Sequence, residues 1–198
     1  MQKQRAIEMP DPTPPDSTGG FSAFLEAHKP PIDGLPSIIL PVKEFITVKA
    51  CPPAWRIYDL YWIRDEEVVF YVGKSDVAYF RIWQHILDGY KGRSTIGRFI
   101  LCNWRASMNF TIELMCSRSG QFTDLENDLS AVEKSLITKF TPCFNLVSNP
   151  KPTPMPAQYL PTTSPIEHAR RLGKVIREAK YVLQGEKRKG WLAELDEN

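Results

Sequence analysis

The stretch that decides the fold is residues 55–85, which read WRIYDLYWIRDEEVVFYVGKSDVAYFRIWQH. Its first part, 57–63, is rich in aromatic and aliphatic side chains and predicts a strand. Charged residues at 64–67 predict the loop of a hairpin. Residues 68–73 are almost continuously apolar, as expected of a second strand that is covered on both faces. The stretch therefore predicts a β-hairpin.

A helix is predicted directly after the hairpin, from Asp76 as its N-cap to about Tyr90, where residues 88–89 (Asp-Gly) begin to end it. Arg81 and His85 stand four positions apart and so share one face of this helix. With the tyrosines of the two strands they form a set of phenol, guanidinium and imidazole groups beside a glycine turn. Groups of this kind are suited to handling phosphate.

The distribution of proline predicts where the folded part of the chain lies. The chain has 17 prolines, and none lies between residues 54 and 141. Proline removes a backbone donor and interrupts regular elements, so this window is expected to hold the folded centre. Within it, helical spacing predicts a helix over 95–106, strict alternation predicts a half-buried strand over 109–116, and an apolar stripe predicts a long helix over 124–140.

The composition divides the chain into three parts. Residues 1–50 form a proline-rich arm that is expected to be partly disordered and to pack, near its end, on the domain or on a partner. Residues 51–149 form the central domain. Residues 150–198 comprise a proline-rich, extended linker and an amphipathic helix over 165–184 with one basic face.

Composition also limits the class of protein. Of 198 residues, 42% are hydrophobic and 24% are charged, which is typical of a soluble domain with one core. No apolar run approaches the roughly 20 residues that span a bilayer, and no secretory signal is evident, so we expect a cytoplasmic protein without membrane contact. The four cysteines lack the spacing of a zinc site or a disulfide framework. A net charge of +2 does not by itself indicate nucleic-acid binding.

One acidic residue occupies an unusual place on the predicted helix over 124–140. With Leu125 at 0° and about 100° per residue, Glu133 falls at about 80°, on the arc of apolar side chains. A carboxylate on an apolar arc is costly unless it is paired or bound to a metal. Glu126, at about 100°, is a rival ligand, although a first-turn acid is also favoured by the helix dipole.

The motifs in residues 54–147 follow a definite order. They are Ile57-Tyr58, Tyr71-Val72-Gly73, Arg81, His85, Glu133, Pro142 and Asn145. This order resembles that of the GIY-YIG nuclease superfamily, over about half of the chain. Taken singly, each residue has an ordinary structural role, such as a strand tyrosine, but the ordered set in this strand and helix context is specific. One departure is Arg56, which stands where the family has glycine.

The resemblance implies an α+β fold, with a small antiparallel three-stranded sheet flanked by helices, here with an N-terminal arm and a C-terminal helical extension. It also implies hydrolysis of a DNA phosphodiester bond with Mg²⁺ or Mn²⁺ as the cofactor. Carried over by position, Glu133 would hold the metal and Tyr58 would activate or orient the attacking water. Arg81 would neutralise charge that develops on the phosphoryl oxygens.

Four further residues receive supporting roles from the resemblance. Tyr71 would hydrogen-bond near the phosphate, and His85 would assist the nucleophile or position the phosphate. Asn145 would support the site. Lys74 would lower the pKa of the Tyr58 phenol, because an unperturbed tyrosine, with a pKa of about 10, is a poor base at neutral pH.

Two functions fit the sequence. The first is a stand-alone DNA endonuclease, restriction-like or related to defence or repair, whose short chain would read double-stranded DNA with its loops and termini, often as a homo-oligomer. The second is a non-catalytic DNA-binding or assembly module of the same fold, which the glycine departure favours and the retained tyrosine, arginine and glutamate oppose. Candidate DNA contacts are Arg93, Arg98, Arg170, Lys174 and Arg177.

Overall fold

The computed structural model describes residues 37–66, 68–118, 128–166 and 172–196, all within the unit that spans 31–198. Several sequence predictions fall outside these ranges. They are the disorder of residues 1–20, the rival ligand Glu126 and the DNA contact Arg170.

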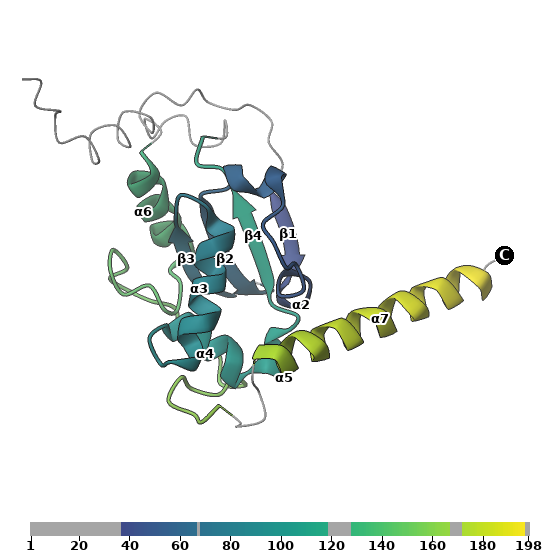
Figure 1. Cartoon of the computed structure of the whole chain (residues 1–198). Helices are drawn as coiled ribbons and strands as arrows, with labels where there is room; N and C mark the ends of the chain where they lie inside the picture. The colour runs from purple at the N-terminus through teal and green to yellow at the C-terminus, as the bar shows by residue number, and fades with distance from the viewer. Residues whose placement is uncertain (1–36, 67, 119–127, 167–171, 197–198) are drawn as a thin grey trace, which may run out of the picture. The chain divides into compact units, whose positions relative to one another are not determined.

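In these ranges, four strands form one antiparallel sheet with the order β1-β4-β2-β3 (Figure 1). The strands are β1 (Ile38–Pro41), β2 (Leu60–Asp65), β3 (Val68–Lys74) and β4 (Thr111–Met115). The predicted α+β class is confirmed, but the predicted number of three strands is wrong. The additional strand is β1, which pairs with β4 and comes from the segment assigned to the N-terminal arm. The boundary predicted at residue 50 therefore lies inside the fold.

The first strand of the hairpin begins later than the sequence suggested. Residues Pro53–Ile57 form a 3₁₀-helix, η1, with proline in its first turn, and β2 starts only at Leu60. Proline has the backbone φ of a helix and no N–H to donate, so it favours this start over a strand. Tyr58, at the end of η1, consequently lies outside the sheet.

A β-bulge in the hairpin changes which side chains face which side. Ile63 pairs with Tyr71 but Arg64 pairs with Val69, so Phe70 is an extra residue in β3. As a result Phe70 and Tyr71 both contact the core on one face of the sheet, although they are neighbours in the chain. Regular alternation from Gly73 places Tyr71 on the same face as Tyr61, and the bulge adds Phe70 to that face.

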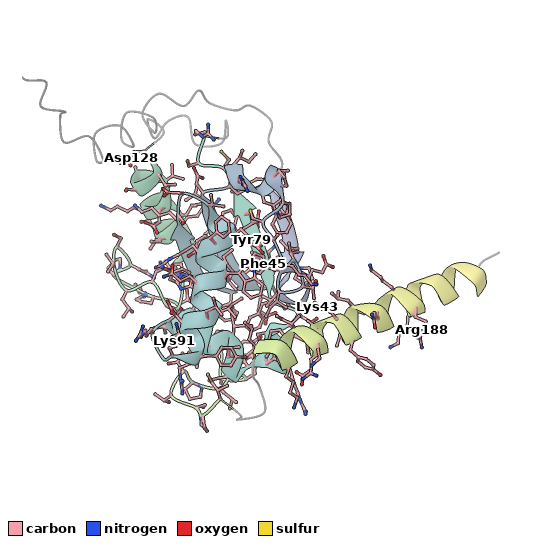
Figure 2. The ribbon with its side chains drawn as sticks, viewed as in Figure 1. Lys43, Phe45, Tyr79, Lys91, Asp128 and Arg188 are labelled. Atoms are coloured by element: carbon pink, nitrogen blue, oxygen red, sulfur yellow. The ribbon has the colours of Figure 1, made fainter. Side chains whose placement is uncertain are left out.

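Helices cover both faces of the sheet (Figure 1). Helices α3 (Ala78–Tyr90), α4 (Thr95–Cys102) and α5 (Trp104–Ser107) contribute to the larger core cluster, and α6 (Leu129–Phe140) packs on the other face. Helix α3 was predicted, but its N-cap is Val77 rather than Asp76. The single helix predicted over 95–106 divides at Asn103, and α6 begins after its capping residue, Asp128, which Figure 2 labels.

The edge of the sheet at β3 is closed by the segment that follows α6. The N–H groups of Cys143 and Phe144 donate to the carbonyls of Val69 and Phe70, at 3.2 and 2.9 Å. Exposed strand edges are prone to pairing with other chains, and this segment covers one.

The proline-rich segment predicted as an extended linker packs against the domain. The ring of Tyr159 is 9% exposed and meets Phe70, Phe99 and Phe110 edge to face. The Asn103 side chain donates to and accepts from the backbone of Leu160, at 3.0 and 2.7 Å. The segment therefore acts as a strap over α4 rather than as a spacer.

The last helix, α7 (Leu172–Asp196), packs on the short helix α2 (Val42–Phe45). Val175 and Ala179 are fully buried, and Lys43, labelled in Figure 2, forms an ion pair of 2.5 Å with Glu186. Among the described residues, no helix combines the length and the apolar character needed to cross a bilayer.

The contact between α3 and α4 gives a stability prediction. A Cβ atom on Gly97 would lie 1.7 Å from the carbonyl oxygen of His85, so Gly97→Ala must push the two helices apart. We expect it to lower the free energy of unfolding by about 3 kcal/mol or more. Urea denaturation followed by circular dichroism measures the change.

Gly185→Ala is the matched control, because no described atom lies within 4 Å of its added Cβ and the residue is in a helix. This variant should be stabilised by about 0.5–1 kcal/mol. Equal effects of the two substitutions would contradict the close packing of α3 on α4.

Candidate active site

Tyr61 is the centre of a buried polar cluster. Its side chain is fully buried, and its hydroxyl lies 2.8 Å from Nε2 of His85. Its ring is 6.1 Å from that of Tyr71, which in turn meets the His85 ring edge to face at 5.2 Å. β2, β3 and α3 thus each contribute one ring to the cluster.

Gly73 leaves room in β3 for the side chains of Tyr61 and Tyr71, which both pass close to its backbone. It pairs directly with Tyr61 in the sheet. A Cβ atom at this position would lie 2.4 Å from the Tyr61 hydroxyl and 2.8 Å from a ring carbon of Tyr71. Any other residue would displace both phenols, so the glycine is explained by the site rather than by its backbone angles.

Tyr58, the tyrosine that the motif order predicts at the site, ends the 3₁₀-helix and does not lie on β2. Tyr58 follows η1, and its carbonyl accepts a hydrogen bond from the Ala78 N–H at 2.8 Å. Burial raises the pKa of its phenol, and the nearby Cys116 raises it further. The tyrosine that contacts Tyr71 and His85 is Tyr61, because the strand begins after residue 58.

His85 is held by hydrogen bonds at both ring nitrogens. Nδ1 lies 2.8 Å from Oγ of Ser94, the N-cap of α4, and this oxygen also accepts the Gly97 N–H at 3.1 Å. Burial lowers the pKa of His85 to about 4, with a further lowering by the Arg81 charge and an opposing effect of Asp88. The imidazole is therefore neutral at physiological pH and can accept a proton at one nitrogen.

Arg81 supplies the positive charge of the cluster. Its guanidinium lowers the pKa of both Tyr61 and Tyr71, although burial keeps the pKa of both phenols above the ordinary value and that of Tyr61 well above it. Nη1 also donates to Oε1 of Gln84 at 2.7 Å. Arg81 thus lies close enough to stabilise negative charge at either phenol.

Glu133 reaches the site from α6, on the other side of Tyr71. Its Oε2 is 3.4 Å from Nζ of Lys74, and its charge raises the pKa of the Tyr71 phenol. The Glu133 side chain is 23% exposed. Tyr71 therefore lies between a guanidinium and a carboxylate, and it links the buried cluster to the acid.

Tyr71 and Glu133 border an open pocket beside β3 with a volume of about 460 Å³. Lining residues that carry chemistry are Tyr71, Lys74, Ser130, Glu133, Lys134 and Asn145. Lys74 donates to Oγ of Ser130 at 2.5 Å and forms an ion pair with Glu133, so its ammonium partly neutralises the Glu133 carboxylate. The predicted action of Lys74 on Tyr58 receives no support from these contacts.

Asn145 is fixed to the edge strand by both halves of its amide. Oδ1 accepts the Val72 N–H and Nδ2 donates to the Val72 carbonyl, each at 2.8 Å. The side chain thus replaces a neighbouring strand at this point. One lone pair of Oδ1 and one N–H of Nδ2 are used in these bonds, which position the pocket wall.

The predicted DNA contacts separate into different environments. Arg98 donates to the carbonyls of Thr162 and Ser164, at 2.5 and 3.1 Å, and so holds the strap on α4. Arg93 and Arg177 are exposed. Lys174 pairs with Glu178 at 3.8 Å. These contacts make Arg98 a structural residue.

The donor set limits the kind of metal that the pocket could hold. Within the described residues, no three His, Cys, Asp or Glu side chains are grouped as for a metal site. Among the described residues that line the pocket, Glu133 is the one carboxylate. Mg²⁺ accepts this arrangement, since it is often bound by one or two carboxylates with water and phosphate oxygens. The residues therefore fit a metal ion whose remaining ligands come from substrate and solvent.

Sequence reasoning missed Tyr61, Ser94 and Ser130. Two signals could have found Tyr61: the prolines at 52 and 53, which delay the strand, and the pairing of Tyr61 with a glycine across the hairpin. The contacts of Ser94 with His85 and of Ser130 with Lys74 join separate elements of the fold, so no local sequence pattern predicts them.

No protein-family model matches the sequence, and comparison with curated proteins and with solved structures found no match. The function is therefore argued from the chemistry of the site.

The buried histidine gives a pH prediction. Because the pKa of His85 falls from 6.5 to about 4 on folding, the unfolded chain binds the proton more tightly. Its contribution to stability is complete above pH 6.5 and is lost as the pH falls towards 4, by up to about 3 kcal/mol. His85→Gln should therefore show a flatter dependence of the free energy of unfolding on pH between 6.5 and 4.

Urea denaturation at several pH values measures this dependence for both proteins. Burial raises the pKa of Asp59, which has the opposite effect on stability in acid, but it contributes equally to both and cancels in the comparison. Parallel profiles would contradict a buried neutral histidine.

Proposed function

We propose that the protein is a DNA endonuclease that hydrolyses phosphodiester bonds with Mg²⁺ or Mn²⁺, in the manner of the GIY-YIG nucleases that its motifs resemble. In this proposal Tyr61 takes the role that the motif order assigned to Tyr58. The observation that carries the proposal is that Tyr71 connects the Tyr61, Arg81 and His85 cluster to Glu133 at one open pocket.

We assign Tyr61 to orienting the attacking water by way of Tyr71. Ser94 Oγ can accept from His85 Nδ1, which leaves Nε2 free to accept the proton of the Tyr61 hydroxyl. Tyr61 is fully buried, so its phenol would act on the water through Tyr71, which lines the pocket. Since burial holds the pKa of Tyr61 well above its usual value, the phenol stays neutral and acts by hydrogen bonding.

Two cations near Tyr71, Arg81 and Lys74, suit phosphoryl transfer. The transition state places negative charge on the phosphoryl oxygens, and its stabilisation depends on positioned cations more than on covalent chemistry. Arg81 lies beside the two phenols, and Lys74 lies at the pocket. Glu133 would hold the metal, which when bound neutralises charge on the phosphate and lowers the pKa of a bound water.

One observation favours the alternative of a non-catalytic DNA-binding or assembly module. The carboxylate of Glu133 is already paired with the Lys74 ammonium, and such a pair needs no metal. The buried polar pair of Tyr61 and His85 favours the enzyme, because burying hydrogen-bonded polar side chains beside the pocket serves no purpose in simple binding to a phosphate backbone.

The test is cleavage of supercoiled plasmid with Mg²⁺ or Mn²⁺, with and without EDTA. Tyr61→Phe, Arg81→Ala and Glu133→Gln should each lower the cleavage rate about 100-fold or more, since each removes a group assigned to the transition state. Tyr58→Phe is the matched control for Tyr61→Phe and should change the rate less than about threefold.

Glu126→Gln is the control for the metal ligand, as the acid that competes with Glu133 in the sequence. Loss of cleavage in Tyr58→Phe but not in Tyr61→Phe would refute the assignment of the site. If the protein binds DNA but cuts none of the DNA tested, the non-catalytic module is the correct function.

A further inference from the structure

A second groove lies between α5 and α7, away from the candidate active site. Its volume is about 880 Å³, and it is lined by Arg105, Met108, Lys174, Arg177, Glu178, Tyr181 and Val182. Arg105 and Arg177 are exposed, and Tyr181 is 79% exposed. Three cations and an aromatic ring thus line this groove, and none of them belongs to the candidate active site.

The cations of this groove continue along one face of α7. At about 100° per residue, the buried residues Val175 and Ala179 define the side that packs on the domain. The side opposite, an arc of about 120°, holds only basic, aromatic and uncharged residues among positions 172–190. They are Gly173, Lys174, Arg177, Lys180, Tyr181, Gln184 and Arg188.

The acids of this part of α7 lie outside that arc. Glu186 forms an ion pair with Lys43, and Glu178 pairs with Lys174. Arg188, labelled in Figure 2, lies beyond these pairs on the outer part of α7. The face is therefore not neutralised by its own helix, except at Lys174.

Charge is concentrated here relative to the rest of the chain. Residues 172–190 carry six Lys or Arg and two Glu, a net charge of +4, whereas the whole chain carries +2. The remainder is thus −2, and three acids at 194, 196 and 197 mark the end of the basic stretch. A local basic surface on a nearly neutral protein is the electrostatic pattern expected for binding a phosphate backbone.

We propose that this face of α7, with Arg105 of α5, binds the backbone of double-stranded DNA at a distance from the cleavage site. This proposal rests on the proposed function, because it takes the substrate of that function, double-stranded DNA, as the ligand of the groove. Guanidinium groups match phosphate geometry, and Arg105 and Arg177 come from different helices to one groove. Tyr181 can pack against sugar or base beside them.

The groove lies at the opposite edge of the sheet from the candidate active site. α7 packs on α2, next to β1, whereas the candidate active site lies at β3, and these strands are the two edges of the sheet. DNA held at α7 is therefore held apart from the DNA at the pocket, so the contact contributes affinity without taking part in cleavage.

The experiment measures binding of a fluorescent 30-base-pair duplex to the full chain in EDTA, by anisotropy, at several salt concentrations. Arg105→Ala/Arg177→Ala should weaken binding roughly tenfold or more at low salt and reduce the slope of log affinity against log salt by about 2. Lys151→Ala/Lys189→Ala removes the same charge from exposed positions off this face and should change neither quantity appreciably.

The outcomes separate this proposal from the function. Binding is measured in EDTA, without metal-dependent cleavage, so a chain that binds the duplex through this face but cuts no DNA leaves this proposal standing and contradicts only the proposed function. Unchanged duplex binding by the Arg105 and Arg177 double variant, with unchanged thermal stability, would overturn it. It would also be overturned if the double variant lost binding to phosphatidylserine vesicles and not to DNA, which would identify a membrane surface.

Discussion

The candidate site depends on one close approach, that of the Tyr61 phenol to the backbone of Gly73. The two residues are paired across the hairpin, and the glycine leaves the space that both phenols occupy. The alternation of β3 places Tyr71 on the same face, two residues before Gly73, and α3 adds His85. Because the protein interior is close-packed, a single added methyl group at Gly73 would disturb all three rings.

The polar groups around this approach are divided by charge. Arg81 lowers the pKa of both phenols, whereas Glu133 raises that of Tyr71 from the other side. His85 stays neutral between them, held by the N-cap serine of α4. One hydroxyl, that of Ser94, therefore both caps a helix and hydrogen-bonds the His85 ring, so the packing of α4 on α3 and the chemistry of the site depend on the same contacts.

Much of the central fold could be predicted, because its elements have strong local patterns. The hairpin, α3, β4 and α6 were found from apolar periodicity and turn residues, and α3 ends at the predicted residue. Their ends were less certain: prolines delayed β2, and Asn103 divided the helix after α3. The pairing of β1 with β4 and the packing of the strap at 150–166 were not predicted, because short, proline-rich segments owe their tertiary contacts to partners far along the chain.

The sequence by itself determined the class of fold and the types of side chain at the candidate site, since strand and helix periodicity place tyrosines, Arg81, His85 and Glu133 around one hairpin. Only the tertiary structure decided which tyrosine contacts Tyr71 and His85, and which acid forms an ion pair with Lys74. Tyr58 and Tyr61 are three residues apart, and a shift in the start of a strand exchanges them. The Lys74 and Glu133 pair joins β3 to α6, a distance in sequence that no local pattern spans.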